Sequence, residues 1–341
     1  MTAATQETPA NVVMMQMLTA KWVSASLSVV AELGIADLLA YGDKTSYELA
    51  EAVSAHSPSL YRVLRALASV GVFAETGGRR FTLTPLAECL RSDVPNSVRQ
   101  FARFTGIPAA AGSWEHLMHS VRTGETGLRK AFDVNNAFDY FREHPEEAAI
   151  FDGAMTDNSR RTAPAIAEAY DFGKFRQLVD IAGGQGLLLA FILQRFTSLE
   201  GVLFDLPEVI AGANNMLTTY GLGSRSITIG GDFFQAIPAG ADAYLLKHII
   251  HDWDDERALA ILRNIRKAIQ PSGRLLIAEV IIAPGNAPSY GKLLDLEMLV
   301  IPGGRERTSD EYRDLFASAG FKLTEIHETT TPTSLIEGVP V

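Results

Sequence analysis

The sequence predicts an α/β protein whose C-terminal half forms a doubly wound, mostly parallel sheet and whose N-terminal part is mostly helical. From residue 177 onward, short apolar runs alternate with stretches of helical periodicity, which is the pattern of parallel strands joined by helices. Before that point apolar residues recur mainly at helical spacing. We therefore expect two structurally different parts in one chain.

Length and composition limit the possible functions. The 341 residues are 47% hydrophobic and 21% charged, enough for more than one core, and the net charge is -10. A negative protein is a poor ligand for nucleic acid backbones and for anionic membranes, so we expect neither as a partner. Cys89 is the single cysteine, which rules out an intrachain disulfide and favours a reducing cytoplasm. A small molecule is the expected ligand.

Residues 1–105 are predicted to form a winged helix. Apolar positions at helical spacing from about residue 12 to 39 are broken by Gly34, which indicates two helices. Ser46 and Ser57 begin two further short helices, and residues 72–84 contain a central Gly-Gly that indicates a hairpin. The N-terminus has no basic region and its apolar segment is interrupted by Lys21, so we expect neither a signal peptide nor a membrane span.

The second helix of a winged helix commonly contacts DNA. Here that helix offers only Arg62 and Arg65, and the domain is not basic. A structural or dimerising role is therefore favoured, and a ligand-responsive transcriptional regulator is the alternative. Residues 106–165 are mostly helical and are interpreted as a connector that contributes to a substrate pocket.

Residues 166–341 are predicted to contain seven strands. Five of them alternate with helices expected at 187–196, 208–220, 255–269 and 309–319. The last two strands, within FKLTEIHETTTPTSLIEGVPV, have no helix between them and predict a terminal antiparallel hairpin. The strands before it are QLVDIA, GVLFDL, SITIGG, AYLLK and GRLLIAEVII.

Polar residues follow the first three strands, and ligands bind at the carboxyl ends of strands in open α/β sheets. LVDIAGGQG does not have the G-x-G-x-x-G spacing of a dinucleotide site, and its Asp180 suits a ligand with an amino-acid moiety. Asp205 can accept both hydroxyls of a ribose, or else cap the helix after Pro207. Asp232 and Phe233 can meet the amino group and the ring face of adenine.

The stretch KHIIHDWDDE follows the fourth strand and contains the candidate general base, His251. Glu279 ends the next strand inside an apolar run, where a carboxylate needs a partner, so it is expected to face the site and orient the imidazole. Glu306 can do the same from the other side, although its segment GGRERT can instead cap the helix that begins near residue 309. Asp252 can cap a helix or steady the histidine. A metal site using His248 and His251 is rejected, because no further ligand cluster is apparent.

Six motifs in fixed order resemble the plant-type, caffeic acid-like O-methyltransferases that use S-adenosylmethionine, in their bacterial natural-product branch. They are LVDIAGGQG, FDLPEVI, GGDFF, LLKHIIHDWDDE, IAEVII and GGRERT. The resemblance covers nearly the whole chain and implies a Rossmann-like methyltransferase domain, an N-terminal dimerisation domain and a homodimer. Ala182 departs from the glycine that is usual in the loop, and we expect altered packing there rather than lost binding.

The resemblance also implies roles for individual residues. His251 is the implied base, flanked by Glu279 and Glu306, with no metal. The implied cofactor contacts, to S-adenosylmethionine and to its product S-adenosylhomocysteine, are Ser159, Asp180, Gly183, Gly184, Asp205, Leu206, Asp232, Phe233 and Lys247. The implied substrate contacts are Phe151, Met155, Asp252 and Met298.

The expected reaction is methyl transfer to a hydroxyl, expected to be phenolic, of a small aromatic metabolite. Such a transfer requires alignment of donor and acceptor and removal of the hydroxyl proton. Relatives that use the same scaffold for hydroxylation or decarboxylation are an alternative, because fold alone does not fix activity. A nicotinamide oxidoreductase is disfavoured by the Asp180 and Ala182 pattern and by the terminal hairpin.

Overall fold

A computed structural model describes residues 8–210 and 213–341. The chain forms two compact units, one of residues up to 111 with 144–157 and the other of residues 112–143 with 158–341. The long helix α11, Pro145–Ala169, contributes residues to both. The connector expected at 106–165 is thus divided between the two units, and the three-part division 1–105, 106–165 and 166–341 stays a prediction about roles.

The first unit contains the helices and the hairpin expected from the sequence. Helices α1 (Ala10–Glu32) and α2 (Ile35–Leu39) are separated at Gly34, whose φ of 65° lies in the left-handed region. They are followed by α3 (Ser46–Ala52), α4 (Ser57–Ser69), β2 (Phe73–Thr76) and β3 (Arg80–Leu83). The short strand β1 (Lys44–Thr45) was not predicted; it pairs with β3 and gives a three-stranded sheet in the order β1-β3-β2.

The first unit has its own apolar core. Leu49, Leu64 and Phe81 are fully buried in it, and they come from α3, α4 and β3. Thr45 caps α3 by accepting the backbone N–H of Glu48, whose carboxylate accepts the N–H of Thr45 in return. Two short helices, α5 (Pro85–Glu88) and α6 (Arg99–Phe104), follow the hairpin.

Helix α1 carries an unusual number of exposed apolar side chains. Met14, Met17, Leu18 and Trp22 are each more than half exposed in this chain. Within the described residues α1 is also the one helix long and apolar enough to cross a membrane. One such helix near the N-terminus is weak evidence for a membrane protein, since signal sequences and helices of soluble proteins pass the same test.

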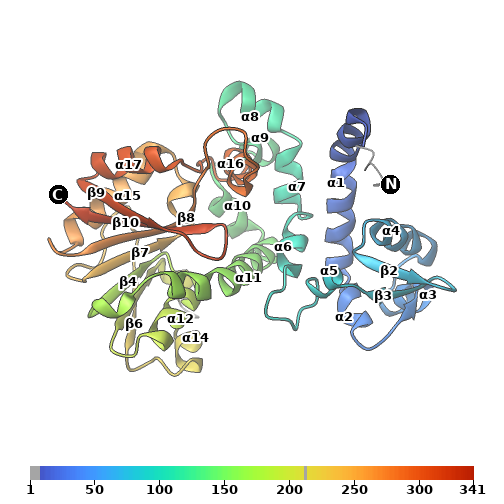
Figure 1. Cartoon of the computed structure of the whole chain (residues 1–341), viewed down its shortest axis with the longest axis horizontal. Coiled ribbons are helices and arrows are strands. Elements are labelled where there is room, and N and C mark those ends of the chain that lie inside the picture. Colours follow the sequence, from blue (N-terminus) through green and yellow to red (C-terminus); the bar gives the residue numbers. More distant parts are fainter. Residues whose placement is uncertain (1–7, 211–212) are drawn as a thin grey trace, which may run out of the picture. The chain divides into compact units, whose positions relative to one another are not determined.

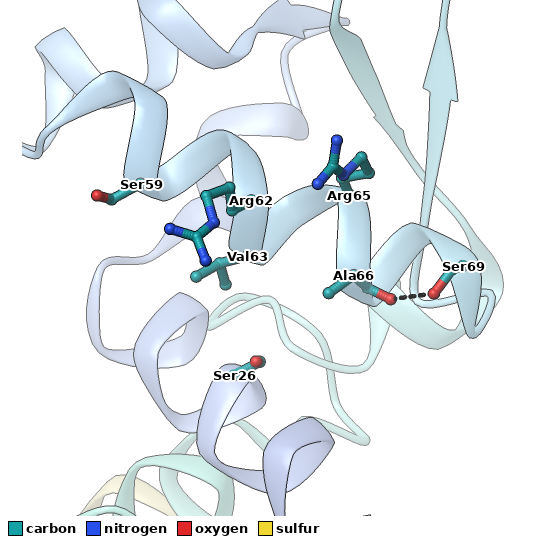
Figure 2. A pocket seen from close by; sticks show the side chains of 7 residues that line it. All are labelled: Ser26, Ser59, Arg62, Val63, Arg65, Ala66 and Ser69. Atoms are coloured by element: carbon teal, nitrogen blue, oxygen red, sulfur yellow. Dashed lines mark hydrogen bonds between the residues drawn. The ribbon is translucent and has the colours of Figure 1, made fainter. Parts of the chain in front are cut away.

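A shallow hollow of about 730 Å³ lies over α4 in the first unit (Figure 2). Its basic side chains are the two that the sequence offered, Arg62 and Arg65, and Ser26 of α1 forms the opposite wall. Arg65 also lies over the ring of Tyr61, with its guanidinium carbon 5.3 Å from the ring centroid. Two arginines in an open hollow do not form the extended basic surface that DNA binding uses.

The second unit is built on a seven-stranded sheet in the order β6-β5-β4-β7-β8-β10-β9 (Figure 1). The five strands from β6 to β8 are parallel, while β10 is antiparallel to both β8 and β9, so the mostly parallel sheet and the terminal hairpin are confirmed. The strands are β4 (Gln177–Ile181), β5 (Glu200–Asp205), β6 (Ser226–Gly230), β7 (Ala243–Lys247), β8 (Arg274–Val280), β9 (Phe321–His327) and β10 (Thr333–Pro340).

Apolar cores cover both faces of this sheet, as expected of a doubly wound fold. Neighbouring strand residues point to opposite faces, so Leu178 belongs to one core and Val179 to the other. Helices α12 (Leu187–Arg195) and α14 (Ala213–Thr219) cover the first face, with part of α11. Helices α15 (Asp255–Ala268) and α17 (Ser309–Ser318) cover the second (Figure 1).

The helix expected at 208–220 is described on both sides of residues 211–212, as α13 (Pro207–Ile210) and α14, while those two residues lie outside the described chain. One helical feature of the second unit differs from the prediction. Helix α16 (Tyr290–Val300), which carries Met298, was not predicted because its apolar residues show little preference for one face. Helix α7 (Pro108–Trp114) belongs to the second unit from residue 112 onward. The remaining helices of this unit are α8 (Leu117–Thr123), α9 (Gly127–Phe132) and α10 (Ala137–Glu143), and short 3-10 turns lie at Phe172–Lys174 and Ile250–Asp252.

Candidate active site

The glycine-rich loop after β4 approaches its surroundings so closely that side chains are excluded. A Cβ on Gly183 would lie 2.4 Å from Cδ1 of Leu203 and 2.5 Å from Oδ2 of Asp180. Gly184 has a φ of 58° and open space where a side chain would point. Ala182, the departure from the expected glycine, also has a positive φ of 53°. The loop leaves exposed backbone that a ligand can approach.

Asp205 lies at the end of β5 and is tied to that loop. Its Oδ2 accepts the backbone N–H of Gly184 at 2.8 Å, and its Oδ1 accepts the N–H of Leu206 at 2.7 Å. Burial raises the pKa of this carboxyl, and the two backbone donors oppose the rise. Among the described residues, no backbone N–H of α13 donates to Asp205, so the alternative role as a helix cap gains no support.

Asp180 is buried near the end of β4, and Lys247 is half-buried at the end of β7, near enough for each charge to affect the other. Burial raises the pKa of Asp180 to about 7 and lowers the pKa of Lys247 to about 8, while each charge opposes the shift of the other. Oδ2 of Asp180 is buried and has no hydrogen-bond partner in the described part of the chain. An unpaired buried carboxylate oxygen beside a glycine loop fits a ligand that brings a cationic amino group.

The remaining predicted cofactor residues lie in the same unit. Asp232 follows β6, and its Oδ1 accepts the N–H of Phe234 at 2.8 Å. Phe233 is partly buried, with its ring centroid 6.1 Å from that of Trp253. Ser159 is half-buried on α11. The second unit thus brings together the strand-end residues that the sequence singled out.

His251 is buried in the 3-10 turn after β7 and is surrounded by carboxylates. Its Nδ1 lies 2.6 Å from Oε1 of Glu306 and 3.3 Å from Oε2 of Glu279. Its Nε2 lies 3.5 Å from Oδ1 of Asp252. A carboxylate only accepts, and the 2.6 Å contact at Nδ1 is a hydrogen bond whereas the 3.5 Å contact at Nε2 is not, so the proton of the neutral ring sits on Nδ1 and Nε2 keeps its lone pair.

The carboxylates decide the charge of the histidine. Burial disfavours the imidazolium, but the charges of Glu279, Asp252 and Glu306 outweigh burial and raise the pKa of His251 to about 10. Burial raises the pKa of Glu279 to about 7 and that of Asp252 to about 6. The positive ring and these acids therefore share protons as one coupled group.

Glu279 also holds the backbone on which His251 sits. It is fully buried, and its Oε1 accepts the N–H groups of Ile249 and Ile250 at 3.0 Å and of His251 at 3.3 Å. The sequence predicted a partner for this carboxylate. Its main hydrogen-bond partner is this backbone turn, while Glu306 is the nearer of the two carboxylates to the imidazole.

The two capping alternatives from the sequence have different outcomes. The segment GGRERT does cap helix α17, through its last residue Thr308, which forms a capping box with Glu311, so Glu306 itself is not the cap. Helix α15 is capped by Asp254, whose Oδ1 accepts the N–H of Arg257 at 2.8 Å, so Asp252 is not the cap. Both carboxylates are left to interact with His251.

The second histidine of the motif has structural partners. Nδ1 of His248 accepts from Nδ2 of Asn158 at 3.0 Å, and its Nε2 lies 3.1 Å from Oγ1 of Thr333. Burial, with the charges of Lys247 and His251 nearby, lowers the pKa of His248 well below its ordinary value. His248 is therefore a neutral link between α11 and β10. Asn158 was missed by the sequence analysis because nothing in FDGAMTDNS marks it.

The donor atoms of His251, Glu279 and Glu306 all lie within 4.8 Å of one another, a spacing that metal sites also show. In this cluster Nδ1 and Oε1 of Glu306 are 2.6 Å apart, which is the length of a charge-assisted hydrogen bond. Both carboxylates also address the same ring nitrogen. We interpret the cluster as hydrogen-bonded.

Aromatic and apolar residues surround this end of the second unit. Met298 is buried on α16, and beside it Oε2 of Glu297 accepts the indole N–H of Trp114 at 2.6 Å. Trp253 packs against Phe138, Phe233 and Phe234. Phe151 and Met155 belong to the first unit, where Phe151 packs on Phe104, and their place in the substrate pocket stays a prediction.

Two family models match this chain. An O-methyltransferase domain matches residues 114–322, and an O-methyltransferase dimerisation domain matches residues 15–93.

The chain belongs to the O-methyltransferase family.

This O-methyltransferase is 43% identical over 333 residues to a phenazine O-methyltransferase from Lysobacter antibioticus, covering 98% of this chain and 97% of the relative. The crystal structure of LaPhzM superposes with a TM-score of 0.93 at 43% identity, covering 98% and 100% of the two chains. The membership confirms the resemblance to plant-type enzymes of bacterial natural-product pathways, and the enzyme uses S-adenosylmethionine.

A third neighbour was crystallised with the cofactor and an aromatic compound. It is an O-methyltransferase from neocarzinostatin biosynthesis in complex with S-adenosylmethionine and 2-hydroxy-5-methyl naphthoic acid, with a TM-score of 0.81, 32% identity and coverage of 93% and 96%. Another relative, 34% identical over 306 residues and covering 87% of this O-methyltransferase and 81% of the relative, is an aclacinomycin 10-hydroxylase from Streptomyces purpurascens. These relatives are enzymes, so the regulator alternative gains no support from them.

Proposed function

We propose that this enzyme methylates a phenolic hydroxyl of a small aromatic metabolite, with His251 as the general base. The observation that best supports this role of His251 is the 2.6 Å hydrogen bond between its Nδ1 and Oε1 of Glu306. This contact places the ring proton on Nδ1 and leaves Nε2 to accept a proton. Asp252, 3.5 Å from Nε2, lies where it can hydrogen-bond to an acceptor hydroxyl.

The cofactor residues of the proposal are those at the strand ends. Asp205 would hold the ribose hydroxyls, Asp180 the amino group, and the backbone at Gly183 and Gly184 the methionine part. Ser159, Leu206, Asp232, Phe233 and Lys247 complete the proposed site. The unpaired Oδ2 of Asp180 and the crowding at Gly183 support this arrangement. S-adenosylmethionine, when bound, supplies an electrophilic methyl group.

The chain's own contribution to the reaction is alignment and proton removal. A phenol has an ordinary pKa of about 10, and the carboxylates raise the pKa of His251 to about 10 as well. Proton transfer from such a hydroxyl to Nε2 is therefore close to balanced. Glu306 and Glu279 stabilise the imidazolium that results, and general base catalysis of this kind contributes roughly 10² to 10⁴-fold in rate.

The acceptor is proposed to be aromatic and hydroxylated. Relatives named for phenazine and for naphthoic acid handle fused aromatic rings. Met298 supplies an apolar wall on α16. Phe151 and Met155 are proposed to complete the pocket.

The assembly and setting are also part of the proposal. The match to a dimerisation domain over residues 15–93 and the exposed apolar side chains of α1 support a homodimer. The negative charge and the single cysteine support a cytoplasmic enzyme that binds neither nucleic acid nor membrane and needs no metal.

The test is turnover of S-adenosylmethionine with a panel of phenols by the wild type and by His251→Ala. We expect loss of turnover with retained S-adenosylhomocysteine binding, because His251 is not among the cofactor residues. His56→Ala is the control, since His56 is an exposed histidine of the first unit whose ring bonds to Ser59. Equal turnover by His251→Ala and the wild type would reject His251 as the base.

Hydroxylation is the competing activity because one relative is a hydroxylase. The paired His251 and Glu306 favour methylation, since proton removal from an acceptor hydroxyl is what this pair can do. Mass spectrometry of the product decides between them. Gain of a CH₂ unit supports methyl transfer, and gain of an oxygen atom supports the hydroxylase reaction.

A further inference from the structure

Arg307 is the largest fully buried side chain of the described residues, with 1% of its side chain exposed. Its five N–H groups bind four acceptor groups at 2.7 to 3.3 Å. Three are the carbonyl oxygens of Ile250, Trp253 and Arg305, and the fourth is the carboxylate of Asp255. Every donor of the guanidinium is used.

The first two of these carbonyls lie on either side of His251 in the chain. Ile250 precedes the histidine and Trp253 follows it by two residues, so the guanidinium bridges both ends of the turn that carries the base. The turn is also held by the N–H of Arg305, which donates to the carbonyl of His251 at 2.8 Å. Arg305 and Arg307 of the segment 304–307 thus hydrogen-bond to the backbone of the turn, while Glu306 of the same segment hydrogen-bonds to the imidazole ring.

The backbone at Gly304 packs so closely against the turn at residues 251–253 that no side chain fits at position 304. A Cβ on Gly304 would lie 2.0 Å from the carbonyl oxygen of His251 and 2.3 Å from the carbonyl carbon of Asp252. The position of Glu306 relative to the imidazole therefore depends on how the segment 304–307 packs against the turn. The planar fork of an arginine is suited to bridging separated acceptors, whereas lysine offers one compact head group.

We propose that Arg307 is a positioning residue for the general base. It holds the backbone on both sides of His251, so that Nδ1 stays on Glu306 and Nε2 keeps its direction toward the acceptor. Asp255, whose carboxylate is 61% exposed, anchors the guanidinium from the surface. This inference rests on the proposed role of His251, and nothing in it involves the cofactor residues.

The first variant is Arg307→Lys, which keeps the charge and loses the bridge. We expect kcat to fall by roughly tenfold to a hundredfold, the cost of misplacing a catalytic group by about 1 Å. The dissociation constant of S-adenosylhomocysteine should stay within about twofold of the wild type, because Arg307 contacts none of the cofactor residues. A loosened contact with Glu306 should also move the rising limb of the kcat profile to lower pH.

The second variant, Asp255→Asn, tests the same network from its exposed side, where the Asp255 side chain is 61% exposed, and thermal unfolding checks that the variant folds. We expect a fall in kcat of about threefold to tenfold, because the anchor loses its charge while its shape is kept. Glu256→Gln is the matched control, since it removes the same charge from the next residue of α15, where the side chain is exposed and forms no ion pair in the described residues.

The outcomes are distinguishable. Lowered kcat in Arg307→Lys and Asp255→Asn, with Glu256→Gln and cofactor affinity unchanged, supports the inference. Wild-type kcat and pH profile in folded Arg307→Lys, or in Asp255→Asn if Arg307→Lys does not fold, overturns it. Parallel loss of kcat and cofactor affinity also overturns it, because that pattern means general structural damage. If His251→Ala keeps full activity, the proposed base itself is wrong.

Discussion

Nδ1 of His251 and Oε1 of Glu306 lie 2.6 Å apart although the two residues are 55 positions apart in the chain. The histidine comes from the turn after β7, and the glutamate from the segment before α17. Glu279, from the end of β8, reaches the same nitrogen only at 3.3 Å and uses its other oxygen on three backbone N–H groups. The two glutamates therefore have different contacts: Glu306 hydrogen-bonds to the imidazole ring, and Glu279 hydrogen-bonds to the backbone of the turn.

This division predicts that Glu306→Gln lowers kcat while leaving the fold intact. An amide can still contact Nδ1, but it no longer stabilises the imidazolium, so we expect a loss of roughly a hundredfold in kcat. Single-turnover kinetics with a phenolic acceptor measure the loss. Glu311→Gln would be a poor control because it disturbs the cap of α17, so Glu325→Gln, at an exposed position of β9, is used instead. An unchanged kcat in Glu306→Gln would contradict the orienting role.

The pH dependence should follow the charge around His251. Since the carboxylates raise the pKa of His251 to about 10, the neutral ring is scarce near neutrality and its fraction increases as pH rises. We expect kcat to rise by about tenfold per pH unit over the range below that pKa. Glu306→Gln removes one negative charge, so its limb should lie at lower pH. Ionisation of the acceptor alone would leave the limb in the same place in both enzymes.

The proposed cofactor site predicts a specific loss of affinity for Asp205→Asn. The carboxylate accepts N–H groups of Gly184 and Leu206, and an amide keeps at most one acceptor oxygen for them and for a ribose. We expect the dissociation constant of S-adenosylhomocysteine to rise by roughly tenfold to a hundredfold, a cost of about 1.4 to 3 kcal/mol. Calorimetric titration measures it. Glu208→Gln removes a charge from the neighbouring helix α13 and should change the affinity less than twofold.

The sequence predicted the sheet of the second unit well because β4, β5, β7 and β8 are mostly apolar and end in distinctive polar motifs. Because strand ends meet at one edge of a parallel sheet, it also predicted that His251 and Glu279 lie close together. Glu306 follows no strand, and its place beside them came from the family resemblance. The sequence could not tell which glutamate lies nearer to the imidazole, because that depends on how the segment 304–307 packs against the turn. Arg307 was missed for the same reason: an arginine in GGRERT looks like a surface residue until its burial is known.

Helix ends show a similar limit. Asp252 and Asp254 are both acidic residues ahead of α15, and either spacing allows a cap. The structure assigns the cap to Asp254 because the 3-10 turn at Ile250–Asp252 delays the start of the helix. A two-residue shift of this kind lies below what helical periodicity resolves.

The interpretation of the histidine cluster as hydrogen-bonded predicts that metal removal has no effect. Dialysis of the enzyme against a chelator, followed by assay in metal-free buffer, should leave kcat within about twofold of the untreated enzyme, because the base needs no ion to lower the pKa of its acceptor. Added Mg²⁺ or Zn²⁺ should not increase the rate. Loss of activity with the chelator, restored by one divalent ion, would refute this interpretation and require a metal bound by His251, Glu279 and Glu306.

The glycine loop predicts that Gly183→Ala damages both binding and stability. The added Cβ would lie 2.4 Å from Leu203 and 2.5 Å from Oδ2 of Asp180, so the loop must move away from β4 or Asp180 must turn out of its place. Overpacking of this kind costs about 1 to 3 kcal/mol, and the displaced Asp180 can no longer meet an amino group. Thermal unfolding with and without S-adenosylhomocysteine measures both effects. Gly223→Ala is the control, since its Cβ would meet only Oγ1 of Thr218, at 3.8 Å. If Gly183→Ala instead gains the same thermal stabilisation from the ligand as the wild type, the backbone at Gly183 is not part of the cofactor site.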